Sequence, residues 1–288
     1  MNASAPVEWP RRLLILGCGN MGGAMLAGWL RAGFEPERFT VVDPMMAQGP
    51  DGVVVLRELP APNARLDKYD AVLLGVKPQL LDAVAPGLNA WLKALSDRPK
   101  VVLSLLAGVE LASLENRLPA ATSWVRIMPN LAAAIGKSPM GVVGAGYHAE
   151  HPKFITDLLA PLGTPEWFQH EGAMDAVTAL AGSGPAFVYR FIDALAQGGA
   201  EIGLPADQAL RLALATVEGA AALAAEAGVP PAELARRVAS PGGTTEAGLK
   251  VLDAATDGIG AMARLVAATL TAARDRSVAM AEAARAAS

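Results

Sequence analysis

The stretch Leu13-Leu-Ile-Leu-Gly-Cys-Gly-Asn-Met-Gly22 decides the fold of the N-terminal part of this chain. Its four aliphatic residues end at Gly17, which is typical of a short buried strand followed by a tight turn. The loop from Gly17 to Gly22 has the spacing G-x-G-x-x-G, and the residues from Asn20 to about Arg31 have the pattern of a helix. Strand, glycine-rich loop and helix in this order predict the start of a parallel α/β sheet.

A second strand and an acidic residue complete this pattern. Phe39-Thr-Val-Val42 predicts the strand, and Asp43 follows it, 21 residues after Gly22. Gly17 would permit the tight turn, Gly19 would let a pyrophosphate approach the backbone, and Gly22 would let the helix pack closely on the strand. The N–H groups of the helix N-terminus attract phosphate, and a carboxylate at Asp43 accepts a hydrogen bond from a ribose 2′-hydroxyl. We therefore expect a dinucleotide site; the alternative is a glycine-rich turn that binds nothing.

Strands and helices continue to alternate up to about residue 170. The expected strands are Asp70–Val76, Lys100–Leu105 and Ser123–Ile127. The expected helices run from Pro78 to about Leu95 and from about Glu110 to Arg117. Two further segments are expected as edge strands, Met140–Gly146 and Glu166–Gln169. This alternation predicts a doubly wound, mostly parallel sheet of the Rossmann type.

Ligands of such sheets bind beyond the carboxyl ends of the strands. Lys77-Pro78, Ala107-Gly108 and Met128-Pro129-Asn130 lie at such ends and are candidate binding residues. Lys77 is the only charged residue between Asp70 and Asp82. Two interpretations of Lys77 stay open, a cation that faces the cofactor or substrate and a solvated lysine at a helix start.

The composition excludes several other classes of protein. The chain has 288 residues, enough for about two domains, and 52% of them are apolar while 18% are charged, so a large core is expected. The net charge of −4 argues against a nucleic-acid-binding surface. The single cysteine, Cys18, excludes an internal disulfide and a cysteine-rich zinc site, and we interpret it as a small loop residue rather than a reactive thiol. The three histidines lack the spacing of a metal motif, so no metal is expected.

The apolar segment Leu13–Leu30 follows Arg11-Arg12 and has some features of a signal peptide or a short membrane span. Glycines and Asn20 interrupt it soon after Leu16, and no cleavage-type motif follows promptly. We therefore expect a cytoplasmic protein without a membrane partner.

Composition changes sharply near residue 170. All five tryptophans and 16 of the 21 prolines precede it, whereas 36 of the 118 residues after residue 170 are alanine, so the C-terminal part is expected to be helical. We divide the chain into a dinucleotide-binding domain of residues 1–169 and an all-α domain of residues 170–288. Alanine-rich helices bury little area per residue, which favours packing against a second copy and predicts a homo-oligomer.

Proline, glycine and capping residues mark the ends of the expected C-terminal helices. Ser183 is the expected N-cap of a helix to Ile202, and further helices are expected from Pro205 to near Gly228, from Ala232 to Val238, after Glu246 to about Ala255, and from a cap at Asp257 almost to the chain end. Ser240-Pro-Gly-Gly-Thr-Thr-Glu246 is the most site-like of these boundaries, because uncovered N–H groups, two hydroxyls and a helix start can hold a small carboxylate. The alternative is an ordinary capped helix start with Glu246 as its third residue.

Several segments together resemble the pyrroline-5-carboxylate reductases of proline biosynthesis. They are Gly17-Cys-Gly-Asn-Met-Gly22, Val76-Lys-Pro-Gln79, Asp175-Ala-Val-Thr-Ala-Leu-Ala-Gly-Ser-Gly-Pro-Ala-Phe187 and Val238-Ala-Ser-Pro-Gly-Gly-Thr-Thr245, with Arg126-Ile-Met-Pro-Asn130 as a fifth match. They stand in the family's order and span nearly the whole chain. The first is shared with many dinucleotide enzymes, whereas the two segments after residue 170 are specific to this family.

The resemblance implies a Rossmann domain, a helical dimerisation domain and hydride transfer from NADPH or NADH to the imine carbon of 1-pyrroline-5-carboxylate, which gives L-proline. The implied cofactor-binding residues are Gly17, Gly19, Asn20, Met21, Gly22, Asp43, Val76, Lys77, Pro78, Met128, Pro129 and Asn130. The implied substrate-binding residues are Ser240, Gly242, Gly243, Thr244 and Thr245. Thr245 would also be catalytic, with its hydroxyl near the imine nitrogen. The pocket would lie between one subunit's nucleotide domain and helices of the dimer.

Two departures from the family pattern concern the cofactor. Leu131 stands where many relatives have threonine, and Asp43 would repel the 2′-phosphate of NADPH, although the family commonly uses NADPH. Our hypothesis is that NADH works at least comparably. The alternative functions are a related imine or 3-hydroxy-acid oxidoreductase of the wider β-hydroxyacid dehydrogenase-like group, and a non-catalytic NAD(P)-binding regulator.

Overall fold

The computed structural model describes residues 12–61, 69–95, 100–146, 150–256 and 259–286. The chain divides into two compact units, one of residues 1–182 together with 274–288, and one of residues 183–273. Helix α10 (Ala261–Ala286) therefore contributes its first half to the second unit and its last turns to the first. The functional division at residues 169 and 170 is drawn at a different place from these compact units and stays a prediction.

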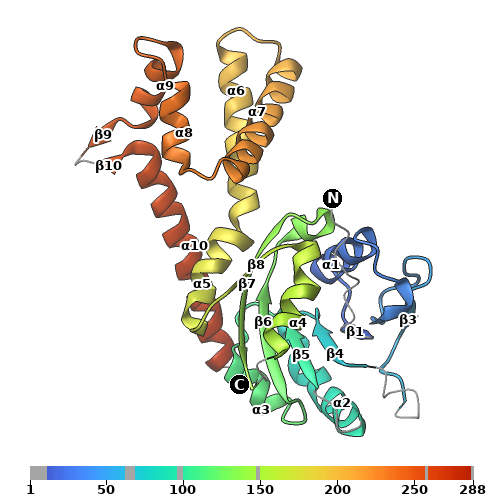
Figure 1. Ribbon diagram of the computed structural model, residues 1–288. Coiled ribbons are helices and arrows are strands. Elements are labelled where there is room, and N and C mark those ends of the chain that lie inside the picture. The colour runs from blue at the N-terminus through green and yellow to red at the C-terminus, as the bar shows by residue number, and fades with distance from the viewer. Residues whose placement is uncertain (1–11, 62–68, 96–99, 147–149, 257–258, 287–288) are drawn as a thin grey trace. The chain divides into compact units, whose positions relative to one another are not determined.

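The described part of the first unit forms an eight-stranded sheet in the order β3-β2-β1-β4-β5-β6-β7-β8 (Figure 1). The strands are β1 (Leu13–Leu16), β2 (Phe39–Val42), β3 (Val54–Leu56), β4 (Ala71–Leu74), β5 (Val101–Ser104), β6 (Ser123–Met128), β7 (Ser138–Ala145) and β8 (Gly163–Trp167). Every neighbouring pair is parallel except β6 and β7. The order from β3 to β6 is that of a doubly wound dinucleotide-binding sheet, so the predicted fold is confirmed.

Apolar residues on both faces of the sheet build the core. Leu13 and Ile15 of β1 join one buried cluster with residues of α1 (Asn20–Arg31) and α4 (Glu150–Leu159). Leu14 and Leu16 join a second cluster with residues of α2 (Leu81–Ala94) and α3 (Leu111–Arg117). The central strand β1 is thus covered on both faces. A ligand can approach it only at its carboxyl end.

The end of the sheet differs from the sequence prediction. β7 was expected at an edge, but it pairs with β6 on one side and with β8 on the other, so that prediction is wrong. β8 is the edge strand, and it begins at Gly163, three residues before its predicted start. The three-residue strand β3 and helix α4 were not predicted.

The second unit is helical. Its helices are α6 (Gly184–Glu201), α7 (Ala206–Glu226), α8 (Pro231–Val238), α9 (Thr244–Leu252) and the first half of α10, and the two-residue strands β9 (Ala255–Thr256) and β10 (Ile259–Gly260) form a small antiparallel pair. Among its described residues, the buried apolar side chains are those of Ala209 and Ala213. Large apolar side chains are instead exposed, including Tyr189 at 67%, Leu223 at 68% and Leu265 at 69%.

The entry into α6 corrects one prediction. Helix α5 (Met174–Val177) continues into a π-helical turn, Thr178–Gly182, before α6 begins. Ser183 stands at the predicted N-cap position and Pro185 lies in the first turn, but Ser183 has helical backbone angles and its side chain makes no capping hydrogen bond. The physical reason is that the chain is already helical before Ser183, which leaves no free helix start there. Asp257, the predicted cap of the last helix, lies outside the described residues.

Taken one at a time, none of the described helices has both the length and the apolar composition needed to cross a membrane. The pair α7 and α8 meets these two requirements only when its members are counted together, and the pair is bent by 120°.

Candidate active site

Gly17 fixes the turn at the end of β1. It has a φ of +86°, and its N–H donates to the carbonyl oxygen of Val42 at 2.9 Å. A Cβ at this position would lie 2.6 Å from the backbone nitrogen of Val76. Glycine is therefore required here both by the backbone angle and by the close approach of the chain that follows β4.

Gly22 in the loop and Gly75 after β4 lie against other backbone atoms, whereas Gly19 has free space around it. A Cβ at Gly22 would lie 2.8 Å from the Gly17 carbonyl oxygen, and one at Gly75 would lie 2.4 Å from the same atom. Gly75 was not recognised from the sequence, although it directly precedes the Val76-Lys-Pro segment. At Gly19 a Cβ would meet no atom within 4 Å, and no side chain caps α1. The open backbone at Gly19 and the uncapped helix start at Asn20 and Met21 are compatible with the predicted binding of a pyrophosphate.

Asp43 closes this loop from the neighbouring strand. One carboxylate oxygen accepts a hydrogen bond from the Cys18 N–H at 2.9 Å, and the other accepts from the Met45 N–H at 2.9 Å. A carboxylate has about four acceptor positions, so Asp43 can also accept from a ribose hydroxyl. Burial, and secondly the Asp43 carboxylate, raise the pKa of the Cys18 thiol, which agrees with the interpretation of Cys18 as an unreactive loop residue.

The residues after β4 lie at the same edge of the sheet. Leu16 pairs in register with Val42 and with Leu74, so the segments that follow these three residues leave the sheet together. Pro78 starts a short 3₁₀ turn, Pro78–Leu80, that leads into α2, and Lys77 stands exposed just before it. The predicted edge residues from β1, β2 and β4 are thus brought together.

Asn130, after β6, is held by the protein itself. It is 5% exposed, and its backbone N–H donates to the Ser138 Oγ at 2.9 Å. Its side-chain oxygen accepts from the Ala132 N–H, and its side-chain nitrogen donates to the Ala181 carbonyl oxygen, each at 2.9 Å. Because Ala181 belongs to the π-helical turn, Asn130 positions that turn against β6, a role that the sequence did not indicate.

The segment Ser240–Glu246 belongs to the second unit. Gly242 has a φ of +70°, and its N–H donates to the Glu246 Oε2 at 2.7 Å. The Gly243 N–H donates to the Ser240 carbonyl oxygen at 2.9 Å, and Thr244 and Thr245 form the exposed first turn of α9. Glu246 therefore binds the N–H group before the N-cap Gly243, and no side chain caps α9, so the N–H groups and hydroxyls of the two threonines remain as candidate ligand donors.

The predicted site residues consequently form two groups, one in each compact unit. Gly17, Gly19, Gly22, Asp43 and Val76 gather at one edge of the sheet, and Ser240 to Thr245 form one loop and helix start. In the described residues no three His, Cys, Asp or Glu side chains are grouped so that they could hold a metal ion.

Comparisons with known proteins identify the family. A family model described as pyrroline-5-carboxylate reductase dimerisation matches residues 171–280, and one described as NADP oxidoreductase, coenzyme F420-dependent, matches residues 12–108. The chain is 35% identical over 274 residues to the pyrroline-5-carboxylate reductase of Pseudomonas aeruginosa, covering 94% of this chain and 97% of the relative. The chain belongs to the pyrroline-5-carboxylate reductase family.

Other members of the family agree with this assignment. The reductase of Glycine max is 35% identical over 242 residues, covering 83% of this chain and 86% of the relative. The structure of a pyrroline-5-carboxylate reductase from Coxiella burnetii aligns with a TM-score of 0.83 at 28% identity, covering 93% of this chain and 98% of that one. As a member of this family the chain is an NAD(P)H-dependent oxidoreductase with a dimerisation region, which confirms the predicted class of enzyme.

Proposed function

We propose that this chain reduces the imine bond of 1-pyrroline-5-carboxylate to give L-proline. The observation that carries the proposal is the 35% identity to a reductase of this name over almost the full length of both chains. The glycine loop with its open position at Gly19 and the Ser240–Glu246 segment supply the two kinds of binding group that the reaction needs.

The cofactor is proposed to bind at the carboxyl edge of the sheet, and its nicotinamide supplies the hydride when it is bound. The backbone at Gly19 and the uncapped start of α1 would hold the pyrophosphate. Asp43 would accept from the adenosine ribose, and Lys77 stands exposed at the neighbouring strand end. Since Asp43 also repels a 2′-phosphate, we propose that NADH is used at least as well as NADPH.

The substrate carboxylate is proposed to bind at the start of α9. Both glycine N–H groups of the loop donate within the protein, so the remaining donors are the backbone N–H groups and hydroxyls of Thr244 and Thr245. The Thr245 hydroxyl would lie near the imine nitrogen and hold the proton that makes the imine carbon electrophilic. Catalysis would then consist mainly of positioning two reactants, without a nucleophile of the protein.

A direct assay tests the reaction. The full-length protein is mixed with 1-pyrroline-5-carboxylate and either NADPH or NADH, and the near-ultraviolet absorbance of the reduced nicotinamide is followed. We expect the absorbance to fall with both cofactors and L-proline to form in equal amount. Cofactor binding without turnover would favour the non-catalytic regulator, and turnover only with other cyclic imines or 3-hydroxy acids would favour the related oxidoreductases.

The exposed apolar side chains of the second unit support self-association as a homodimer or a larger assembly, because surfaces of this kind are usually covered by a partner. Sedimentation of the full chain is expected to give at least twice the monomer mass. Leu212→Asp places a charge on an exposed apolar position of α7 and is expected to weaken the assembly. Arg211→Ala, which removes an exposed arginine paired with Asp207, is the control.

We also propose that the enzyme is located in the cytoplasm.

A further inference from the structure

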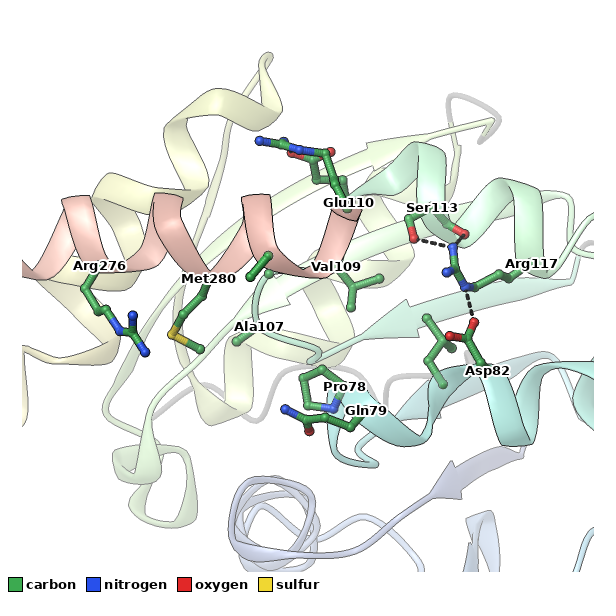
Figure 2. A pocket seen from close by; sticks show the side chains of 14 residues that line it. Pro78, Gln79, Asp82, Ala107, Val109, Glu110, Ser113, Arg117, Arg276 and Met280 are labelled. Atoms are coloured by element: carbon green, nitrogen blue, oxygen red, sulfur yellow. Dashed lines mark hydrogen bonds and ion pairs between the residues drawn. The ribbon is translucent and has the colours of Figure 1, made fainter. Parts of the chain in front are cut away.

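A cavity of about 410 Å³ lies in the first unit, away from the glycine loop. Its walls come from the start of α2, the loop between β5 and α3, helix α3 and the last turns of α10 (Figure 2). A volume of this size is typical of pockets that hold small organic molecules. Pro78, predicted to bind the cofactor, and the strand-end residues Ala107 and Gly108 line this cavity, whereas the glycine loop, Asp43 and the Ser240–Thr245 segment do not.

Two of the three arginines in the wall are already neutralised. Arg117 donates to the Asp82 carboxylate at 2.6 Å and to the Ser113 hydroxyl at 2.7 Å. Arg285 forms an ion pair with Glu110. These pairs line the cavity without adding net charge to it.

Arg276 differs from both. Within the described part of the chain it has neither an ion-pair nor a hydrogen-bond partner. Figure 2 shows its side chain, like that of Met280, on the side of α10 where Pro78 and Gln79 lie. The three arginines and two carboxylates of the wall therefore leave one positive charge in excess, and it belongs to Arg276.

The rest of the lining is largely apolar and comes from Pro78, Leu81, Ala107, Val109, Met280 and Ala283. A ligand that fits such a lining has an apolar body and a single negative charge, because a second anionic group would meet the carboxylates of Asp82 and Glu110. We infer that this cavity binds a small organic monocarboxylate with an apolar body, and that Arg276 holds its carboxylate.

The position of the cavity gives this binding a consequence for the enzyme. Pro78 and Gln79 line it and directly follow Lys77, a predicted cofactor-binding residue. A ligand that packs against Pro78 restrains this strand end. Binding of the monocarboxylate and of the cofactor are therefore expected to alter each other's affinity by the same factor.

Benzoate and its neutral analogue benzamide are the probes, measured by ligand-observed NMR on the full-length protein. Benzoate is expected to bind more tightly than benzamide. Arg276→Gln is expected to weaken benzoate about tenfold, as a charge-assisted hydrogen bond requires, and to leave benzamide unchanged. Arg274→Gln is the matched control, since Arg274 stands on the same exposed helix but is paired with Asp275 at 2.6 Å.

Equal binding of benzoate and benzamide, or an unchanged affinity for benzoate in Arg276→Gln, would overturn the inference. So would loss of benzoate binding in Thr245→Val, because it would place the probe in the proposed substrate site. The inference does not depend on the proposed reaction: a protein without reductase activity that binds benzoate through Arg276 would refute only the proposed function.

Discussion

The two glycine-rich loops of this chain keep their shape in different ways. In the loop from Gly17 to Gly22, a Cβ at either end glycine would lie within 3 Å of backbone atoms of the protein itself. In the Ser240–Glu246 loop, a Cβ at Gly242 would meet no atom within 4 Å, and the Gly242 N–H is held by one side chain, that of Glu246. The first loop is fixed by packing of the sheet, whereas the second is fixed by local hydrogen bonds.

This difference has a physical meaning for the two halves of the proposed reaction. A pyrophosphate is bound by backbone groups, so the loop that receives it must be rigid before binding occurs. The second loop opens a helix whose first residues are exposed, and its donors become useful only when a small anion is held against them. Substitutions at the packed end glycines of the first loop should therefore affect folding, and those of the threonines after the second loop should affect turnover.

The largest effect is expected for Gly17→Ala. The substitution forces a side chain into a φ of +86° and brings its Cβ to 2.6 Å from the Val76 nitrogen, so the free energy of unfolding should fall by about 3 kcal/mol. Gly242→Ala meets a φ of +70° in open space and should cost about 1 kcal/mol. Urea unfolding of both variants measures the difference; equal costs would contradict the contrast between the loops.

Gly19→Val separates binding from folding within the first loop. Gly19 has a φ of −68°, and a Cβ there would meet nothing, so stability should change by less than about 1 kcal/mol. The side chain would occupy the space proposed for the pyrophosphate, and the affinity for NADPH and NADH should fall about a hundredfold. Isothermal titration with each cofactor measures this. Unchanged affinity would remove Gly19 from the cofactor site.

Thr245→Val tests the second loop. The substitution keeps the shape of an exposed residue at the start of α9 and removes only its hydroxyl. We expect kcat to fall about 10- to 100-fold, with the KM of the cofactor and the unfolding midpoint unchanged. The neighbouring Thr244→Val is the comparison, and it should act mainly on the KM of the substrate. Full activity in Thr245→Val would rule out the proposed role of its hydroxyl.

The sequence predicted the first loop well because its signals are local. β1, α1 and β2 begin and end at the predicted residues, and Asp43 lies beside the loop as the spacing required. β3 was missed because it has three residues and no side chain fully buried, so it carries no periodic pattern. The place of β7 in the sheet was wrong because it depends on pairing with β8, a contact between distant segments.

The sequence indicated which residues belong to the candidate site, but it did not indicate the hydrogen bonds that these residues make. Ser183 stands at the start of α6 as predicted, but its side chain caps no N–H group because the preceding π-helical turn, which no local motif indicates, is already helical. Asn130 was predicted to bind the cofactor, which stays a prediction, and no sequence pattern indicated that its side chain hydrogen-bonds to Ala132 and Ala181. Such roles depend on which segments meet in three dimensions, and a single sequence does not contain that information directly.

Asp43→Asn tests the link between the first loop and cofactor choice. Asparagine keeps one acceptor for the Cys18 N–H but removes the negative charge and one carboxylate oxygen. We expect the KM for NADH to rise about tenfold and the KM for NADPH to fall, because the repulsion of the 2′-phosphate is removed. Steady-state kinetics with both cofactors measures the change. An unaltered ratio of the two KM values would exclude Asp43 from cofactor selection.

The smallest effect concerns Cys18, inside the first loop. Burial, and less so the Asp43 carboxylate, raise the pKa of its thiol, so the neutral form is favoured in the folded protein. The protonated thiol therefore contributes to the free energy of unfolding below the pKa of an ordinary thiol. This contribution is lost as the pH rises through the raised pKa of Cys18. Alkylation by iodoacetamide should thus be slow at neutral pH and increase only above the range of a free thiol. Asp43→Asn should accelerate it only about two- to threefold, because burial, the larger cause, remains. Fast alkylation of the folded wild-type protein at neutral pH would show that the first loop opens, which would contradict its fixation by packing.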